Sequence, residues 1–74
     1  MVTPTTDIST RVSSELLNDP RTEAYSHNID VAVDRGMVTL SGTVPSERVR
    51  EAAEEVARKT QGVISVINEL KIKG

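Results

Sequence analysis

The sequence predicts an α+β fold, a two-layer αββαβ sandwich in which a three-stranded mixed sheet carries two helices on one face. Apolar residues repeat every three or four positions in two segments and alternate with polar residues in three others. The segments follow one another as helix, strand, strand, helix and strand. At 74 residues the chain has the length of one small domain, which we place at 7–74 after a flexible N-terminal tail at 1–6.

The first helix is predicted over 7–17. Its apolar residues recur every four positions and form one stripe: Ile8, Val12 and Leu16. Thr6 or Asp7 is expected to cap its start, because short polar side chains accept a hydrogen bond from the first turn. Pro20 cannot continue a helix and disfavours helical angles in the residue before it. The segment 21–28 is therefore predicted to be a polar connection.

Two strands joined by a tight turn are predicted over 29–34 and 37–44. Alternate residues form the inward-facing set: Ile29, Val31, Val33, Val38, Leu40, Gly42 and Val44. Gly36 follows Arg35 between the strands and supplies the positive φ that a two-residue hairpin turn needs.

The second helix has the clearest helical spacing in the chain. Pro45 ends the preceding strand, Ser46 is placed to cap the helix, and the apolar stripe follows: Val49, Ala52, Ala53, Val56 and Ala57. Gly62 is expected at the first position after the helix cap. A third strand then runs to the end of the chain, where Ile64, Val66, Asn68, Leu70 and Ile72 alternate with Ser65, Ile67, Glu69, Lys71 and Lys73.

The second helix acts as a crossover, so we expect the third strand to lie parallel to the second, with the second in the middle. A wholly antiparallel sheet with the first strand central is the alternative. The predicted core places a helical set against a sheet set: Ile8, Val12, Leu16, Val49, Ala53 and Val56 against Val31, Val33, Val38, Leu40, Val66, Leu70 and Ile72.

Composition excludes several functions. Without Cys there is no disulfide or thiolate–metal site, and the lone His27 makes no zinc site, so we expect no metal and no cofactor. A net charge of −2 with Tyr25 as the only aromatic residue argues against a nucleic-acid partner. His27, Ser26 and Asp30 are the residue types of a hydrolase triad, but no nucleophile elbow accompanies them, so no catalytic residue and no enzyme are predicted. We also expect no targeting signal in this chain.

Two segments carry a resemblance to a known family: the run Gly36-Met-Val-Thr-Leu-Ser-Gly42, and Gly62-Val63 followed by Val66 and Asn68. In this order and spacing the chain resembles the BON domain over about 7–73, which makes 7–74 a single BON-like domain. The resemblance implies a non-enzymatic attachment module of the bacterial envelope, periplasmic or membrane-associated, linked to osmotic protection or transport. It also implies that Gly36, Gly42, Gly62 and Asn68 are structural landmarks.

Two of these landmarks face the predicted core. We expect Gly42 to allow close approach of the second helix at Ala52 or Ala53. The amide of Asn68 needs partners if it is buried, and a bond to neighbouring backbone is the simplest solution.

The face of the sheet that no helix covers is the candidate binding face, with Met37, Ile67, Lys71 and Lys73 as its proposed binding residues. The expected partner is membrane phospholipid or another envelope component. Binding by one copy is predicted to be weak, because two lysines contribute only about 2 kcal/mol at a membrane surface. The alternative is a protein–protein or oligomerisation module, with a protein partner or a tandem domain, that uses this face or an exposed strand edge.

Overall fold

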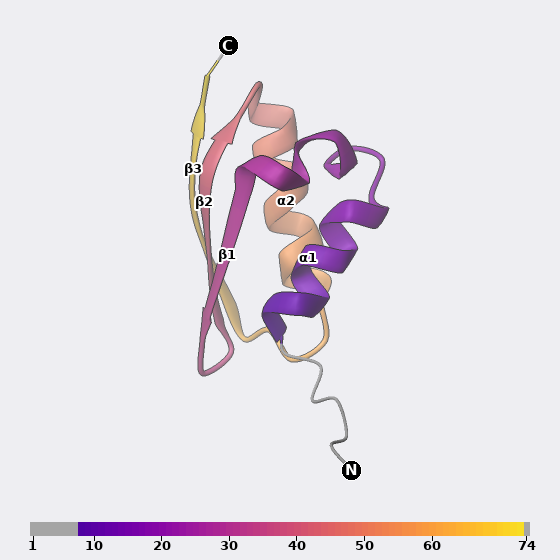
Figure 1. Cartoon of the computed structure of the whole chain (residues 1–74). Coiled ribbons are helices and arrows are strands. Elements are labelled where there is room, and N and C mark those ends of the chain that lie inside the picture. Colours follow the sequence, from indigo (N-terminus) through magenta and orange to yellow (C-terminus); the bar gives the residue numbers. More distant parts are fainter. Residues whose placement is uncertain (1–7, 74) are drawn as a thin grey trace.

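The computed structural model describes residues 8–73 and has the predicted order of elements, with one addition (Figure 1). The elements are α1 (Ile8–Asn18), the 3₁₀ helix η1 (Glu23–Asn28), β1 (Ile29–Asp34), β2 (Met37–Val44), α2 (Glu47–Lys59) and β3 (Ser65–Ile72). Both α-helices lie on the same side of the three-stranded sheet, which confirms the α+β fold in two layers. The predicted tail and the caps Thr6 and Asp7 lie outside the described residues, and the domain boundaries stay predictions.

The sheet has the order β1-β2-β3, with β2 antiparallel to β1 and parallel to β3. This order confirms the mixed sheet and rules out the wholly antiparallel alternative. The turn between β1 and β2 consists of Arg35 at φ 54° and Gly36 at φ 85°. Positive φ at both central residues is what a type I′ hairpin turn requires, and this turn matches the twist of the strands it joins.

The core lies between the helices and the sheet and is almost entirely aliphatic. Its buried members are Val12, Leu16, Ile29, Val38, Leu40, Val44, Val49, Ala53, Val56, Ala57 and Leu70. Most of the predicted core is among them, and Ile8, Val31, Val33 and Val66 pack against it while partly buried.

Ile72 was predicted in the core, and this prediction was wrong. Its side chain is 47% exposed, although its neighbour in the sheet, Val44, is buried. Alternation places Ile72 on the helix side of the sheet, but β3 is the edge strand and Ile72 is its last residue. An inward phase leads to burial only where a helix extends far enough to cover the position.

The segment between α1 and β1 is more ordered than a polar connection. It contains η1, and Thr22 just before η1 is buried. The Thr22 hydroxyl donates to the Leu16 carbonyl at 2.6 Å. This bond satisfies a carbonyl at the end of α1, where no further turn of helix supplies a donor.

Helix α2 begins as predicted, with the Ser46 hydroxyl accepting a hydrogen bond of 3.4 Å from the Val49 N–H. It ends at Lys59 with Thr60 as the C-cap, so Gly62 lies two residues beyond the cap rather than immediately after it. Gly62 still adopts a positive φ of 98°, as the reversal into β3 requires. No helix within residues 8–73 is long and apolar enough to cross a membrane.

Leu40 lies at the centre of the packing, fully buried on β2 between Val31 and Asn68 of the neighbouring strands. Leu40→Ala is expected to reduce the free energy of unfolding by about 2–5 kcal/mol, because it removes buried methyl groups and leaves a cavity. Chemical denaturation measures the change. A loss below about 0.5 kcal/mol, within the usual range for surface substitutions, would contradict the central position of β2.

Candidate functional site

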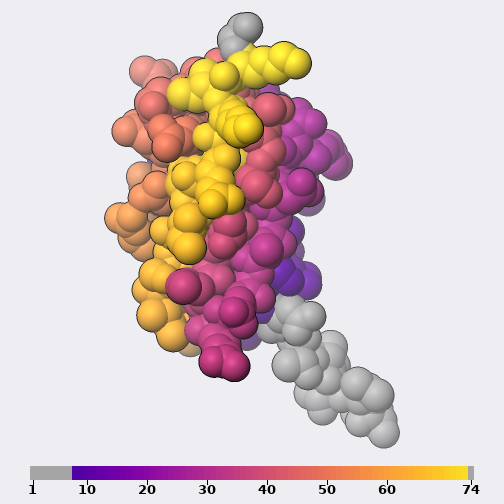
Figure 2. Space-filling model, turned by 90° about the vertical axis from the view of Figure 1, so that its left-hand side faces the viewer, coloured from indigo at the N-terminus to yellow at the C-terminus, as the bar shows by residue number. Residues whose placement is uncertain are grey.

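The side of the sheet away from the helices forms one continuous surface, the open face (Figure 2). Because neighbours in register share a face, its members follow from the strand pairing. They are Asp30, Ala32 and Asp34 of β1, Met37, Thr39, Ser41 and Thr43 of β2, and Ser65, Ile67, Glu69 and Lys71 of β3. Lys73 follows β3 in the same phase. The structure thus places all four predicted binding residues on one face.

The apolar part of the open face lies toward the hairpin end. Met37 is 43% exposed and Ile67 is 42% exposed. Ile67 pairs with Thr39, while Met37 pairs with Ser65 two residues before Ile67, so the two apolar side chains are diagonal neighbours. They form a small apolar patch between hydroxyl side chains.

The basic part lies at the other end of the open face, where Lys71 pairs with Thr43. The N–H of Lys73 donates to the Val44 carbonyl at 2.8 Å, which holds the end of the chain against β2. Asp30, Asp34 and Glu69 share this face, so three carboxylates against two lysines leave a net charge of −1. The face therefore has a basic end but no overall positive charge.

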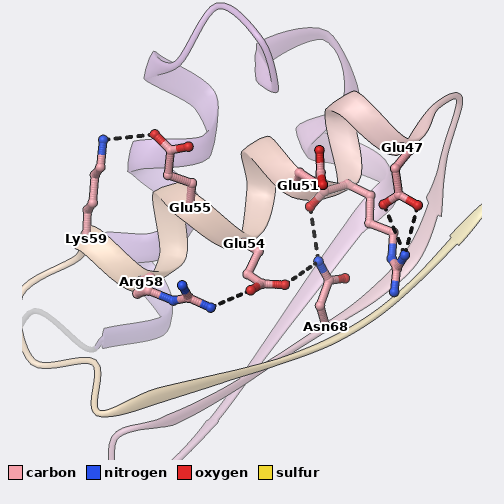
Figure 3. Close-up of a pocket in the computed structure, with 8 residues that line it drawn as sticks. Glu47, Glu51, Glu54, Glu55, Arg58, Lys59 and Asn68 are labelled. Carbon is pink, nitrogen blue, oxygen red and sulfur yellow. Dashed lines mark hydrogen bonds and ion pairs between the residues drawn. The ribbon is translucent and has the colours of Figure 1, made fainter.

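Asn68 joins the edge strand to α2 on the opposite side of the sheet (Figure 3). Its Nδ2 donates to the Arg50 carbonyl at 3.0 Å and to Glu54 Oε1 at 3.2 Å. Its Oδ1 accepts from the Leu70 N–H at 3.1 Å. The expected bonds to backbone are present, so the amide of this partly buried residue is satisfied on both sides.

A groove of about 520 Å³ runs between α2 and β3, and sequence reasoning did not anticipate it. It is lined by Glu47, Arg50, Glu51, Glu54, Glu55, Arg58, Lys59 and Asn68. Ion pairs join Glu47 to Arg50 and Glu54 to Arg58 (Figure 3). Glu55 pairs with Lys59 farther along α2, and the packing of α2 against β3 brings Glu54 to Asn68.

Among the described residues, shifted pKa values occur in the turn after α1, at Asp19 and Arg21, and on α2 at Glu55. The hydrogen bond from Lys59 lowers the pKa of Glu55, and the hydrogen bond from the Arg21 side chain lowers the pKa of Asp19. Arg21 also reaches Glu55 at 3.5 Å and so links the end of α1 to α2. Lowered pKa values keep these carboxylates ionised, the opposite of what a general acid near neutral pH needs.

The Ser and His of the residue types considered for a hydrolase triad both lie on η1. The Ser26 hydroxyl donates to the Glu23 carbonyl at 3.1 Å, and His27 is exposed on η1. Within residues 8–73 no group of three or more His, Asp or Glu side chains is placed to hold a metal ion.

Gly42 has a different structural role from the one predicted. Its φ is 122°, and a Cβ at this position would lie 1.9 Å from the carbonyl oxygen of Asn28. The close approach is therefore made by backbone where η1 meets β1, and not by Ala52 or Ala53 of α2. Gly36 likewise has a tight contact, since a Cβ there would lie 2.7 Å from the Ile64 side chain.

Sequence comparison with known proteins identifies the family of this chain. The sequence model of the BON domain matches residues 4–74, and the chain belongs to the BON domain family, which confirms the resemblance seen in the sequence. The chain is also similar to "Osmotically-inducible protein Y" of Escherichia coli (strain K12), with 44% identity over 48 residues. That match covers 65% of this chain and 24% of the relative. The matched segment thus spans about a quarter of that protein.

Gly42→Ala is expected to destabilise the fold about as strongly as Gly42→Val, by about 2–3 kcal/mol, because the clash with the Asn28 carbonyl arises at the Cβ itself. Denaturation midpoints of both variants measure this. A Gly42→Ala variant with the denaturation midpoint of the parent would contradict both the contact with Asn28 and the strain expected at this positive φ.

Asn68→Asp is expected to lower the free energy of unfolding by about 1–3 kcal/mol at neutral pH, since a carboxylate cannot donate to Arg50 and faces Glu54. This environment raises the pKa of the introduced carboxyl in the folded state. The difference from the parent chain should therefore shrink as the pH falls through that pKa. A deficit that does not depend on pH in denaturation experiments would contradict this account.

Proposed function

We propose that this BON domain is a non-enzymatic attachment module that places its open face against an anionic phospholipid surface of the bacterial envelope. The observation that carries this proposal is the arrangement of the face, where an apolar patch at Met37 and Ile67 lies on the same surface as Lys71 and Lys73. Apolar side chains can enter the headgroup region while lysines contact lipid phosphates. The name of the similar protein records osmotic induction, which supports a role in osmotic protection. A role in transport and a place in the periplasm or on a membrane are parts of the same proposal.

Binding by one copy must be weak. Each lysine contributes about 1 kcal/mol near an anionic surface, while the carboxylates of the open face oppose adsorption. A dissociation constant in the millimolar range or above follows, unless several copies act together. The chain matches only a quarter of its longer relative, so further modules in a longer protein are one source of such copies.

Lys71→Glu combined with Lys73→Glu is expected to weaken co-sedimentation with anionic vesicles by about 30-fold or more, since about 2 kcal/mol of attraction is lost. A tandem fusion of two copies brings the affinity into a measurable range. The melting temperature should not change, because both side chains are exposed. Binding of the parent should decrease with added salt and should be much weaker on neutral vesicles.

The matched control is Arg11→Glu with Arg48→Glu, two exposed positions on the helices that change the net charge equally. This variant should bind nearly as well as the parent, because its substitutions lie away from the open face. If the Lys71 and Lys73 variant retains binding, or if the parent binds neutral vesicles equally at high salt, docking through these lysines is wrong. A protein partner would then be the better explanation of the face.

A further inference from the structure

The outer side of β3 is an unpaired strand edge within residues 8–73. The Lys73 N–H points toward β2, where it donates to Val44, whereas the Leu70 N–H donates to the side chain of Asn68. Backbone groups alternate in direction along a strand, so the even-numbered residues of β3 direct their N–H and C=O groups outward. These are the groups of Val66, Asn68, Leu70 and Ile72.

Exposed apolar side chains accompany this edge. Among the described residues five large apolar side chains are exposed, and three of them lie on β3 or directly before it: Ile64 at 80%, Ile67 at 42% and Ile72 at 47%. A strand edge of eight residues without Pro and with exposed isoleucines is a template for pairing with another strand.

The charges beside the edge indicate which strand fits. Glu69 and Lys71 flank Leu70 on the open face. When two copies of β3 pair antiparallel about Leu70, Glu69 of each copy lies opposite Lys71 of the other. Moving the centre by one residue in either direction places Glu69 opposite Glu69 or Lys71 opposite Lys71, and like charges directly opposite are unfavourable. The sequence of β3 is thus complementary to itself in one central register.

We propose that β3 pairs with β3 of a second copy of this chain, antiparallel and with a twofold axis at Leu70. The outward backbone groups of Asn68, Leu70 and Ile72 bond to those of the second copy and extend the sheet. Asn68 Oδ1 must release the Leu70 N–H for this, which keeps the pairing weak and reversible. The twofold axis leaves both open faces on the same side. The pairing itself does not depend on the lipid binding proposed above.

Sedimentation velocity without lipid tests this pairing, from micromolar to millimolar concentration at low salt. The parent chain should show a reversible monomer–dimer equilibrium. Glu69→Lys and Lys71→Glu each place like charges opposite one another twice, so each should raise the dimer dissociation constant by about tenfold. The double variant restores opposite charges in exchanged positions and should return the constant close to that of the parent.

Two matched controls separate pairing from general charge effects. Asp30→Lys makes the same charge change as Glu69→Lys, but on β1, away from the proposed contact. Lys73→Glu makes the same charge change as Lys71→Glu, but residue 73 lies opposite the uncharged Ile67 of the second copy. Both controls should dimerise like the parent. A parent that sediments as a monomer at every concentration overturns the proposal. So does a dimer that the single reversals leave unchanged or that the double variant does not restore.

Amide chemical shifts locate the contact independently. They should change with concentration at Asn68, Leu70 and Ile72 and stay constant along β1. Changes confined to β1 would overturn the proposed edge. No lipid is present in these measurements, so failed vesicle binding leaves the pairing intact, and failed pairing leaves the vesicle result intact.

Discussion

The two α-helices offer too little apolar surface to cover more than one face of the sheet. Helix α1 has 11 residues, of which two are buried, and α2 has 13 residues, of which five are buried. These stripes are fully used against the covered side of the strands, and no Phe or Trp is present to extend the core. The opposite side of the sheet is consequently left to solvent. The open face follows directly from this limit on burial.

β2 is the central strand of the sheet, between β1 and β3. Val38, Leu40 and Val44 are buried, and the row is interrupted at Gly42, where the backbone of Asn28 passes close by. A side chain at Gly42 would push the end of η1 away from the sheet. The segment from α1 to β1, which includes the buried Thr22, therefore keeps its position only because residue 42 of β2 is a glycine.

The edge of β3 shows how one side chain can serve two elements. Asn68 satisfies an outward N–H of its own strand and binds the backbone of α2, while Glu54 connects that contact to Arg58. The Asn68 side chain thus covers the Leu70 N–H in the middle of the edge, while the side chains of Ile67 and Ile72 remain exposed beside it. The proposed attachment through the open face and the proposed pairing through this edge use neighbouring surfaces. A pair of copies would present two open faces to one membrane.

The order of elements, the phase of each strand and the hairpin turn could be predicted from the sequence, because alternation, helical spacing and Gly36 act over a few neighbouring residues. The same alternation is sufficient to predict that Met37, Ile67 and Lys71 share one face of the sheet. Tertiary structure alone decided the exposure of Ile72, the reason for Gly42 and the groove between α2 and β3. Each of these depends on where the end of one element lies against a distant part of the chain. Such distances result from packing the whole core and have no signature in local sequence.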